Sequence, residues 1–171
     1  MPAQYLDEYA RELRRDGEKA FRKRHGQPVL IVTKAEKDGA SPSSASVEVA
    51  VVADTSGWRL PAASLVGRVF VVSRGAFVDP GPVTLGRTDG TELTIADKSV
   101  SKKHCVFEPA AGGLRITDLG STNGTSVDGE PLPPNVPRAL AGGETIDIGN
   151  FELVYQTADG FVAYLRARPE G

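Results

Sequence analysis

Apolar side chains recur along the first part of the chain with the period of an amphipathic α-helix. Between residues 3 and 25 they are spaced three and four positions apart, and charged residues fill most of the remaining positions. The stripe consists of Tyr5, Leu6, Tyr9, Leu13, Ala20 and Phe21. Gly17 is a weak point in this pattern, and Gly26 is a suitable residue to end a helix. The pattern therefore predicts one long helix over 3–25.

After this helix the apolar runs shorten to the length of β-strands. Residues 28–34 and 47–53 are rich in β-branched and apolar side chains, and each run predicts a strand. The segment 37–44 between them contains Gly, Pro and several Ser residues, which is typical of a mobile loop. We expect the helix to pack on the neighbouring domain, with dimerisation or partner binding as the alternative. Residues 1–65 as a whole form an N-terminal extension, for which three interpretations stay open: an element packed on the sandwich, a dimer arm or a second small module.

From about residue 66 the chain consists of short apolar runs, most of them ended by glycine-rich turns. The runs are 69–72, 83–85, 93–95, 104–107, 114–116, 125–127, 145–148 and 151–155. The dipeptides Asn123-Gly124 and Asp128-Gly129 are typical of two-residue turns that join antiparallel strands. Short strands at this spacing predict a mainly β protein, with an antiparallel β-sandwich over 66–158.

Two later segments have patterns of their own. The proline-rich stretch 131–137 is interpreted as a stiff loop between late strands, with a ligand for proline-binding modules as the alternative. Phe161, Tyr164 and Leu165 lie at helical spacing. Residues 159–171 are therefore expected to form a short C-terminal helix and a tail.

The composition excludes several classes of protein. The 171 residues are 40% hydrophobic and 25% charged, which is enough to bury a core. The formal net charge of -2 argues against bulk binding to nucleic acid or to an anionic membrane. One cysteine and two histidines provide neither a disulfide framework nor the ligand clusters of common metal sites. We interpret Cys105 as core filler and expect neither a metal nor a cofactor.

The chain also lacks signals for a membrane or for export. A membrane-spanning helix needs ~20 apolar residues, and the apolar runs here are much shorter. The first residues have neither the basic head nor the apolar centre of a signal peptide. We therefore expect a cytoplasmic protein.

Three polar clusters interrupt the predicted strands. They are Gly86-Arg87, then Ser101-Lys102-Lys103-His104, then Asp118-Leu119-Gly120-Ser121-Thr122-Asn123-Gly124-Thr125. Each cluster alone is weak evidence, because a strand-ending arginine, a turn-capping serine or an Asn-Gly turn is common. Together and in this order, followed by Val127-Asp128-Gly129 and the run 142–149, they closely resemble the forkhead-associated (FHA) domain family. The resemblance covers residues 66–158.

The resemblance implies a sandwich that binds phosphothreonine peptides through loops at one end. A phosphothreonine carries about −1.5 to −2 charges and three acceptor oxygens. Arg87 matches the position that donates two parallel N–H groups, Lys102 adds a point charge, and Ser101 offers a hydroxyl and a backbone N–H. Thr122 offers a second hydroxyl, and the Asn123 carboxamide suits the peptide backbone.

Other matched residues are expected to support the site. Gly86 is expected to allow a sharp turn before the arginine, and Gly124 to supply a positive φ. His104 is expected to brace the loop that carries the serine. Asp118 is expected to tie the third loop, with Ser121 beside it.

Two alternatives to a phosphopeptide module stay open at this point. In the first alternative, the domain is a phospho-independent scaffold that binds partners through its sheet faces or its N-terminal helix. In the second, it is a hydrolase built on Ser101, His104 and Asp118. The hydrolase is disfavoured because the Gly-x-Ser-x-Gly nucleophile elbow is absent. The expected partner is a Ser/Thr kinase or its substrate, not nucleic acid or membrane, and the oligomeric state is open.

Overall fold

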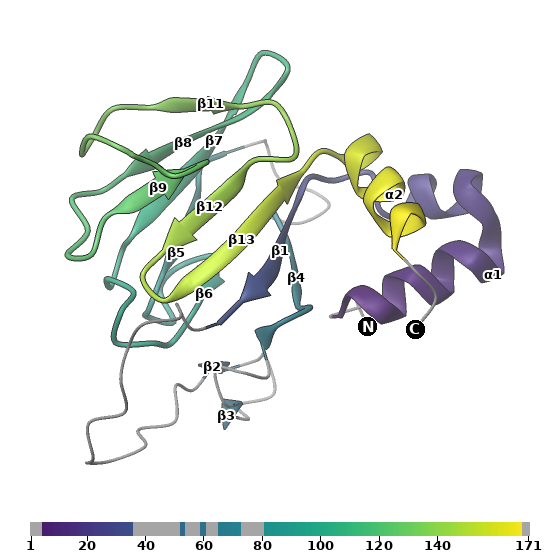
Figure 1. Cartoon of the computed structure of the whole chain (residues 1–171), viewed down its shortest axis with the longest axis horizontal. Helices are drawn as coiled ribbons and strands as arrows, with labels where there is room; N and C mark the ends of the chain where they lie inside the picture. Colours follow the sequence, from purple (N-terminus) through teal and green to yellow (C-terminus); the bar gives the residue numbers. More distant parts are fainter. Residues whose placement is uncertain (1–4, 36–51, 54–58, 61–64, 73–80, 169–171) are drawn as a thin grey trace.

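Two β-sheets lie face to face, with two helices against one of them (Figure 1). The computed structural model describes residues 5–35, 52–53, 59–60, 65–72 and 81–168. In chain order the elements are α1 (Leu6–Arg24), β1 (Val29–Lys34), β2 (Val52–Ala53), β3 (Arg59–Leu60), β4 (Val69–Val71), β5 (Val83–Gly86), β6 (Leu93–Thr94), β7 (Cys105–Ala110), β8 (Gly113–Asp118), β9 (Thr125–Val127), β10 (Glu130–Pro131), β11 (Arg138–Leu140), β12 (Thr145–Ile148), β13 (Phe151–Gln156) and α2 (Ala158–Ala167).

The sandwich predicted from the short apolar runs is confirmed. One sheet has the order β10-β9-β12-β13-β1-β4, the other has the order β11-β8-β7-β5-β6, and β2 pairs with β3. The described strand pairs are antiparallel except for β5 and β6, which are parallel. Each short strand predicted between residues 69 and 155 corresponds to an observed strand.

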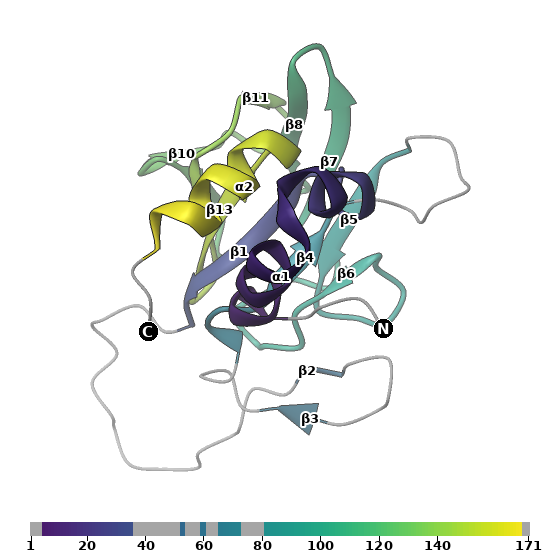
Figure 2. The ribbon, with the colours of Figure 1, turned by 90° about the vertical axis from the view of Figure 1, so that its right-hand side faces the viewer.

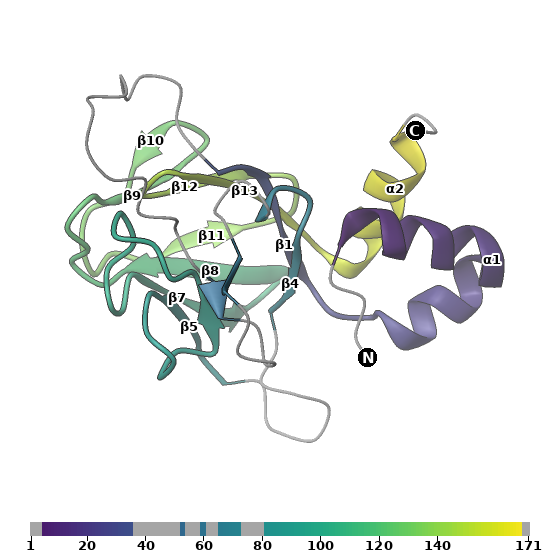
Figure 3. The same cartoon turned by 90° about the horizontal axis from the view of Figure 1, so that it is seen from below.

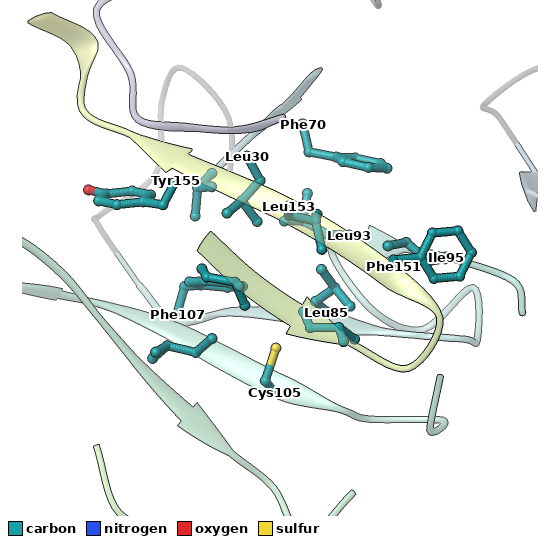
Figure 4. Close-up of a cluster of buried hydrophobic side chains, with 14 of the residues drawn as sticks. Leu30, Phe70, Leu85, Leu93, Ile95, Cys105, Phe107, Phe151, Leu153 and Tyr155 are labelled. Carbon is teal, nitrogen blue, oxygen red and sulfur yellow. The ribbon is translucent and has the colours of Figure 1, made fainter. Parts of the chain in front are cut away.

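The core lies between the two sheets. Leu85 and Phe107 from one sheet meet Leu30 and Leu153 from the other, and all four are fully buried. Figure 4 shows the Cys105 sulfur directed into this space, and burial raises the pKa of its thiol. Cys105 is therefore a small apolar core residue with no reactive thiolate.

Strand β1 is buried on both faces, which explains its uninterrupted apolar run. Leu30 and Val32 belong to the core between the sheets, whereas Val29 and Ile31 pack against the helices. β1 pairs with β13 on one side and β4 on the other. Residues within the predicted extension thus supply an interior strand of the sandwich. The division into 1–65, 66–158 and 159–171 stays a prediction.

The prediction of one continuous N-terminal helix is wrong at Gly17. This glycine has φ 78° and ψ 162°, which breaks α1 into two helical segments. In a straight helix Tyr9 and His25 would lie about 24 Å apart, yet their ring centroids are 5.1 Å apart. The second segment therefore folds back along the first (Figure 3).

The two helices cover the outer face of the six-stranded sheet near β1 and β4. Figure 2 shows α1 and α2 side by side in front of this sheet. Tyr9, Phe21 and Phe161 are buried together there, on Val29 and Ile31. The predicted C-terminal helix is confirmed as α2. Among the described residues, no helix is long and apolar enough to cross a membrane.

Two turn predictions have different outcomes. Asp128 and Gly129 have φ 51° and 81° and join β9 to β10 as a two-residue hairpin, as predicted. Asn123 and Gly124 instead lie in the connection between β8 and β9, which belong to different sheets. The hairpin interpretation of that dipeptide is therefore wrong.

Two further predictions concern loops and strands outside the sandwich core. The proline-rich stretch 131–137 begins in β10 and ends just before β11, two short strands that the apolar pattern did not reveal. Of the predicted strand 47–53, only Val52 and Ala53 are described, in β2. The predicted loop 37–44 lies outside the described residues.

Candidate functional site: a loop cluster at one end of the sandwich

Three loops come together at the end of the sandwich where β5 ends and β7 begins. Arg87 directly follows β5, and its backbone N–H donates to the carbonyl of Ser101, 3.0 Å away. Asp118 ends β8 and pairs with Cys105 at the start of β7, so the loop that follows β8 reaches the same end. The β12–β13 turn also lies at this end, and β13 runs from it toward α2 (Figure 1).

Gly86 is required here for a close approach of two chains. A Cβ at this position would lie 2.1 Å from the backbone oxygen of Lys102. Gly86 ends strand β5 and is absent from the described glycines that have positive φ. Gly86 therefore needs no left-handed conformation, and its missing side chain lets the Arg87 and Lys102 loops touch.

Ser101 joins the second loop to the third. Its Oγ accepts a hydrogen bond from the backbone N–H of Thr122 at 3.0 Å, which leaves the hydroxyl proton available to a ligand. Its own backbone N–H donates to Nδ1 of His104 at 3.0 Å. The predicted use of this N–H toward phosphate is therefore wrong, because the group is already engaged.

His104 is fully buried between these loops. Because Nδ1 accepts from Ser101, the ring proton lies on Nε2, which donates to the carbonyl of Gly124 at 3.0 Å. Burial lowers the pKa of His104, although the hydrogen bond to Gly124 and the negative charge of Asp118 oppose this shift. The neutral imidazole thus connects the serine loop to the Asn-Gly loop.

Asp118 organises the third loop from inside. Its Oδ2 accepts from the backbone N–H groups of Gly120 and Ser121, and its Oδ1 accepts from the hydroxyls of Ser121 and Thr125. Burial alone would raise the pKa of Asp118, but the hydrogen bonds from Ser121 and Thr125 outweigh it, and the pKa is lowered. The carboxylate is therefore ionised, and both of its oxygens accept hydrogen bonds from the loop.

The exposed tip of this loop carries Thr122 and Asn123. Gly124 follows them with φ 76°, a left-handed conformation that glycine adopts without strain. The Asn123 Nδ2 donates to the carbonyl of Ser99 at 2.8 Å. Both Thr122 and Asn123 are solvent-exposed.

Comparisons with known proteins identify this arrangement. The chain is 33% identical over 123 residues to the glycogen accumulation regulator GarA of Mycolicibacterium smegmatis. The aligned region covers 68% of this chain and 72% of that protein. A profile of the FHA domain matches residues 83–149. The chain belongs to the FHA domain family.

Other similarities agree with this assignment. This FHA protein is 34% identical over 109 residues to an oxoglutarate dehydrogenase inhibitor of Corynebacterium glutamicum, which covers 60% of this chain and 72% of that protein. Its fold matches the crystal structure of an FHA domain from Chlamydia trachomatis with a TM-score of 0.51 at 16% identity, over 76% of this chain and 96% of that one. The resemblance read from the three clusters is thus confirmed.

The cations of the FHA loop cluster are not consumed by internal ion pairs. Arg87 is half-buried, and Lys102 and Lys103 are exposed. Within the described part of the chain, none of these three side chains has an ion-pair or hydrogen-bond partner. The Arg87 loop is joined to Ser101 by a backbone hydrogen bond, and Lys102 and Lys103 directly follow that serine.

Ser99 belongs to none of the sequence motifs, yet it contacts both Asn123 and the β12–β13 turn of the FHA sandwich. The only local signal was the spacing Asp97-x-Ser99, in which the carboxylate accepts from the serine N–H at 2.7 Å. This spacing is typical of an Asx-turn and says nothing about distant loops.

Proposed function

We propose that this FHA domain binds phosphothreonine peptides at the loop cluster. FHA domains are modules that recognise phosphorylated motifs with arginine clusters. The observation that carries the proposal is the hydrogen bond between Ser101 Oγ and the Thr122 N–H, which joins two predicted phosphate-binding residues. The backbone bond from Arg87 to Ser101 brings the guanidinium-bearing loop to the same place.

Each residue has a distinct part in this proposal. The Arg87 fork donates two N–H groups to phosphate oxygens, and Lys102 contributes a flexible charge. The Ser101 proton and the Thr122 hydroxyl donate to the remaining oxygens. Asn123 binds the peptide backbone beside the phosphorylated residue. Two to four charge-assisted hydrogen bonds of ~1.5–3 kcal/mol each, reduced by the cost of ordering the peptide, give roughly micromolar affinity.

The geometry also supports a module without catalysis. A hydrolase would need His104 to accept a proton from the Ser101 hydroxyl. Instead Nδ1 accepts from the Ser101 backbone N–H and Nε2 donates to Gly124. With both ring nitrogens engaged by the backbone, His104 is a structural residue and not a general base.

Kinase signalling is the proposed setting. Relatives of this chain are named as a regulator of glycogen accumulation and as inhibitors of oxoglutarate dehydrogenase, which are regulatory roles. The proposed partner is a cytoplasmic protein phosphorylated on threonine, either a Ser/Thr kinase or its substrate. This chain would bind that protein only after phosphorylation.

The test is calorimetric titration with matched peptides. A phosphothreonine peptide selected from an oriented library is compared with its phosphoserine and unphosphorylated forms. We expect micromolar binding of the first, weaker binding of the second and no binding of the third. Equal binding of the phosphorylated and plain peptides, or no binding across the library, would support the phospho-independent scaffold instead.

A further inference from the structure

Ser99 makes one hydrogen bond within its own loop and one to each of two distant segments. Its backbone N–H donates to Asp97 Oδ1 at 2.7 Å, and its Oγ accepts from the backbone N–H of Asn150 at 2.9 Å. Its carbonyl accepts from Asn123 Nδ2 at 2.8 Å. The residue thus connects the serine loop, the β12–β13 turn and the tip of the third loop.

The β12–β13 turn touches Ser99 because position 149 has no side chain. A Cβ on Gly149 would lie 2.4 Å from Ser99 Oγ and 2.5 Å from its carbonyl oxygen. These are backbone and short side-chain atoms that cannot move aside freely. The turn and Ser99 are therefore in direct contact, and the Ser99 carbonyl accepts from Asn123.

This contact determines which way the Asn123 carboxamide faces. A carbonyl oxygen only accepts, so the amide nitrogen of Asn123 must face Ser99 and its Oδ1 must face away. One N–H and Oδ1 are left for a ligand. An exposed asparagine that is already held in one orientation loses less entropy when a peptide binds.

We propose that Ser99, which is in contact with Gly149, is a positioning residue that orients the Asn123 carboxamide toward the peptide backbone. The proposal rests on the phosphothreonine-binding function above. It divides the site into a phosphate part, held by Arg87 and Ser101, and a backbone part, held through Ser99. Changes at Ser99 or Gly149 therefore weaken peptide binding without weakening phosphate binding.

The main test replaces Gly149 by alanine, with Gly112→Ala as the matched control. Gly112 also has a positive φ, 82°, but lies in the distant β7–β8 turn with open space around its Cβ position. Both variants carry similar backbone strain, and only Gly149→Ala displaces Ser99. We expect Gly149→Ala to lower the affinity for the phosphothreonine peptide about tenfold and Ser99→Ala to lower it about threefold. Gly112→Ala is expected to leave this affinity unchanged.

Two readouts separate positioning from general damage. Inorganic phosphate, titrated by NMR, is expected to bind Gly149→Ala and the wild type equally. In an Asn123→Ala background, Gly149→Ala and Ser99→Ala are expected to cost no further peptide affinity, because the coupled group is gone. Equal losses for phosphate and peptide, or full additivity with Asn123→Ala, would overturn the proposal.

A measurement on the free protein keeps the two proposals distinguishable. The side-chain amide of Asn123 is expected to be rigid by ¹⁵N relaxation in the wild type and in Gly112→Ala, and mobile in Gly149→Ala. An amide that stays rigid in Gly149→Ala contradicts positioning by Ser99. Failure of every phosphothreonine peptide to bind the wild type contradicts the proposed function, whatever the amide does.

Discussion

The loop end and the helical layer of this protein use charge in opposite ways. In the helical layer, arginines pair with carboxylates: Arg24 lies 2.7 Å from Glu12, Arg166 lies 2.6 Å from Glu18, and Arg22 pairs with Asp159. At the loop end, Arg87, Lys102 and Lys103 have no such partner among the described residues. The ion pairs of the helical layer are mostly exposed and add little to its stability, whereas the unpaired cations of the loop end stay free for the proposed anion.

The two regions also differ in how their shape is maintained. Apolar and aromatic burial holds the helices, with Phe21 and Phe161 fully buried. Hydrogen bonds that buried His104 and Asp118 make with backbone and hydroxyl groups hold the loops. Apolar packing tolerates small adjustments, whereas a hydrogen-bonded loop places its donors accurately. A binding site for phosphate needs the second kind of support.

Replacing Arg87 by alanine is the strongest way to test this comparison. Two lost charge-assisted hydrogen bonds cost ~3–6 kcal/mol, so phosphothreonine-peptide affinity is expected to fall more than 100-fold in calorimetry. The melting temperature is expected to stay unchanged, because Arg87 has no described side-chain partner. Arg24→Ala in the helical layer serves as the control and is expected to leave affinity intact. Equal peptide affinity of Arg87→Ala and the wild type would contradict the proposed binding site.

Replacing His104 by alanine should affect folding as well as binding. The change leaves the half-buried Ser101 N–H and Gly124 carbonyl without their partner and removes a fully buried ring. We expect the free energy of unfolding to fall by ~2–4 kcal/mol in urea denaturation, together with a loss of peptide binding. A variant with unchanged unfolding would contradict the bracing role of this residue.

Replacing Gly17 by alanine addresses the helical layer alone. The φ and ψ of Gly17 are disfavoured for alanine, which also prefers to continue the helix and so opposes the fold-back. A loss of ~1–3 kcal/mol in the free energy of unfolding is expected, with no change in peptide affinity. A large loss of affinity would show that the two regions are coupled.

The pH dependence of stability is the smallest expected effect. The pKa of folded His104 is lower than its unfolded value of ~6.5, so between these values the unfolded chain binds more protons. Stability is therefore full above about pH 6.5 and falls as the pH drops toward the folded pKa. Urea denaturation at pH 7.5 and 5.5 measures this loss, which is at most ~1.4 kcal/mol per pH unit. The loss should shrink in His104→Asn, and an unchanged loss there would assign it to other groups.

Local sequence patterns were sufficient to predict the structure where a residue's conformation depends on its immediate neighbours in the chain. The alternation in β13 and the Asp128-Gly129 turn predicted a strand and a hairpin that the structure contains. The positive φ of Gly124 is equally local. The order of the three polar clusters predicted the family and most residues of the candidate site.

The apolar stripe of α1 could not reveal its break. A straight helix and a folded-back pair present the same spacing of apolar residues, and only packing distinguishes them. Tyr9 and Phe21 reach Phe161 from opposite segments of α1 because the chain reverses at Gly17. Phe161 lies far away in the sequence, so the choice depends on a contact that no local window contains.

The residue types and their periodicity decided the sandwich, the two terminal helices and the set of polar side chains at the proposed phosphate site, because strand and turn preferences act within a few positions. The three-dimensional arrangement decided the reversal at Gly17, the close approach at Gly86 and the role of Ser99. Each of these depends on distances between segments far apart in the chain. Such distances arise only when the two sheets close on their common core.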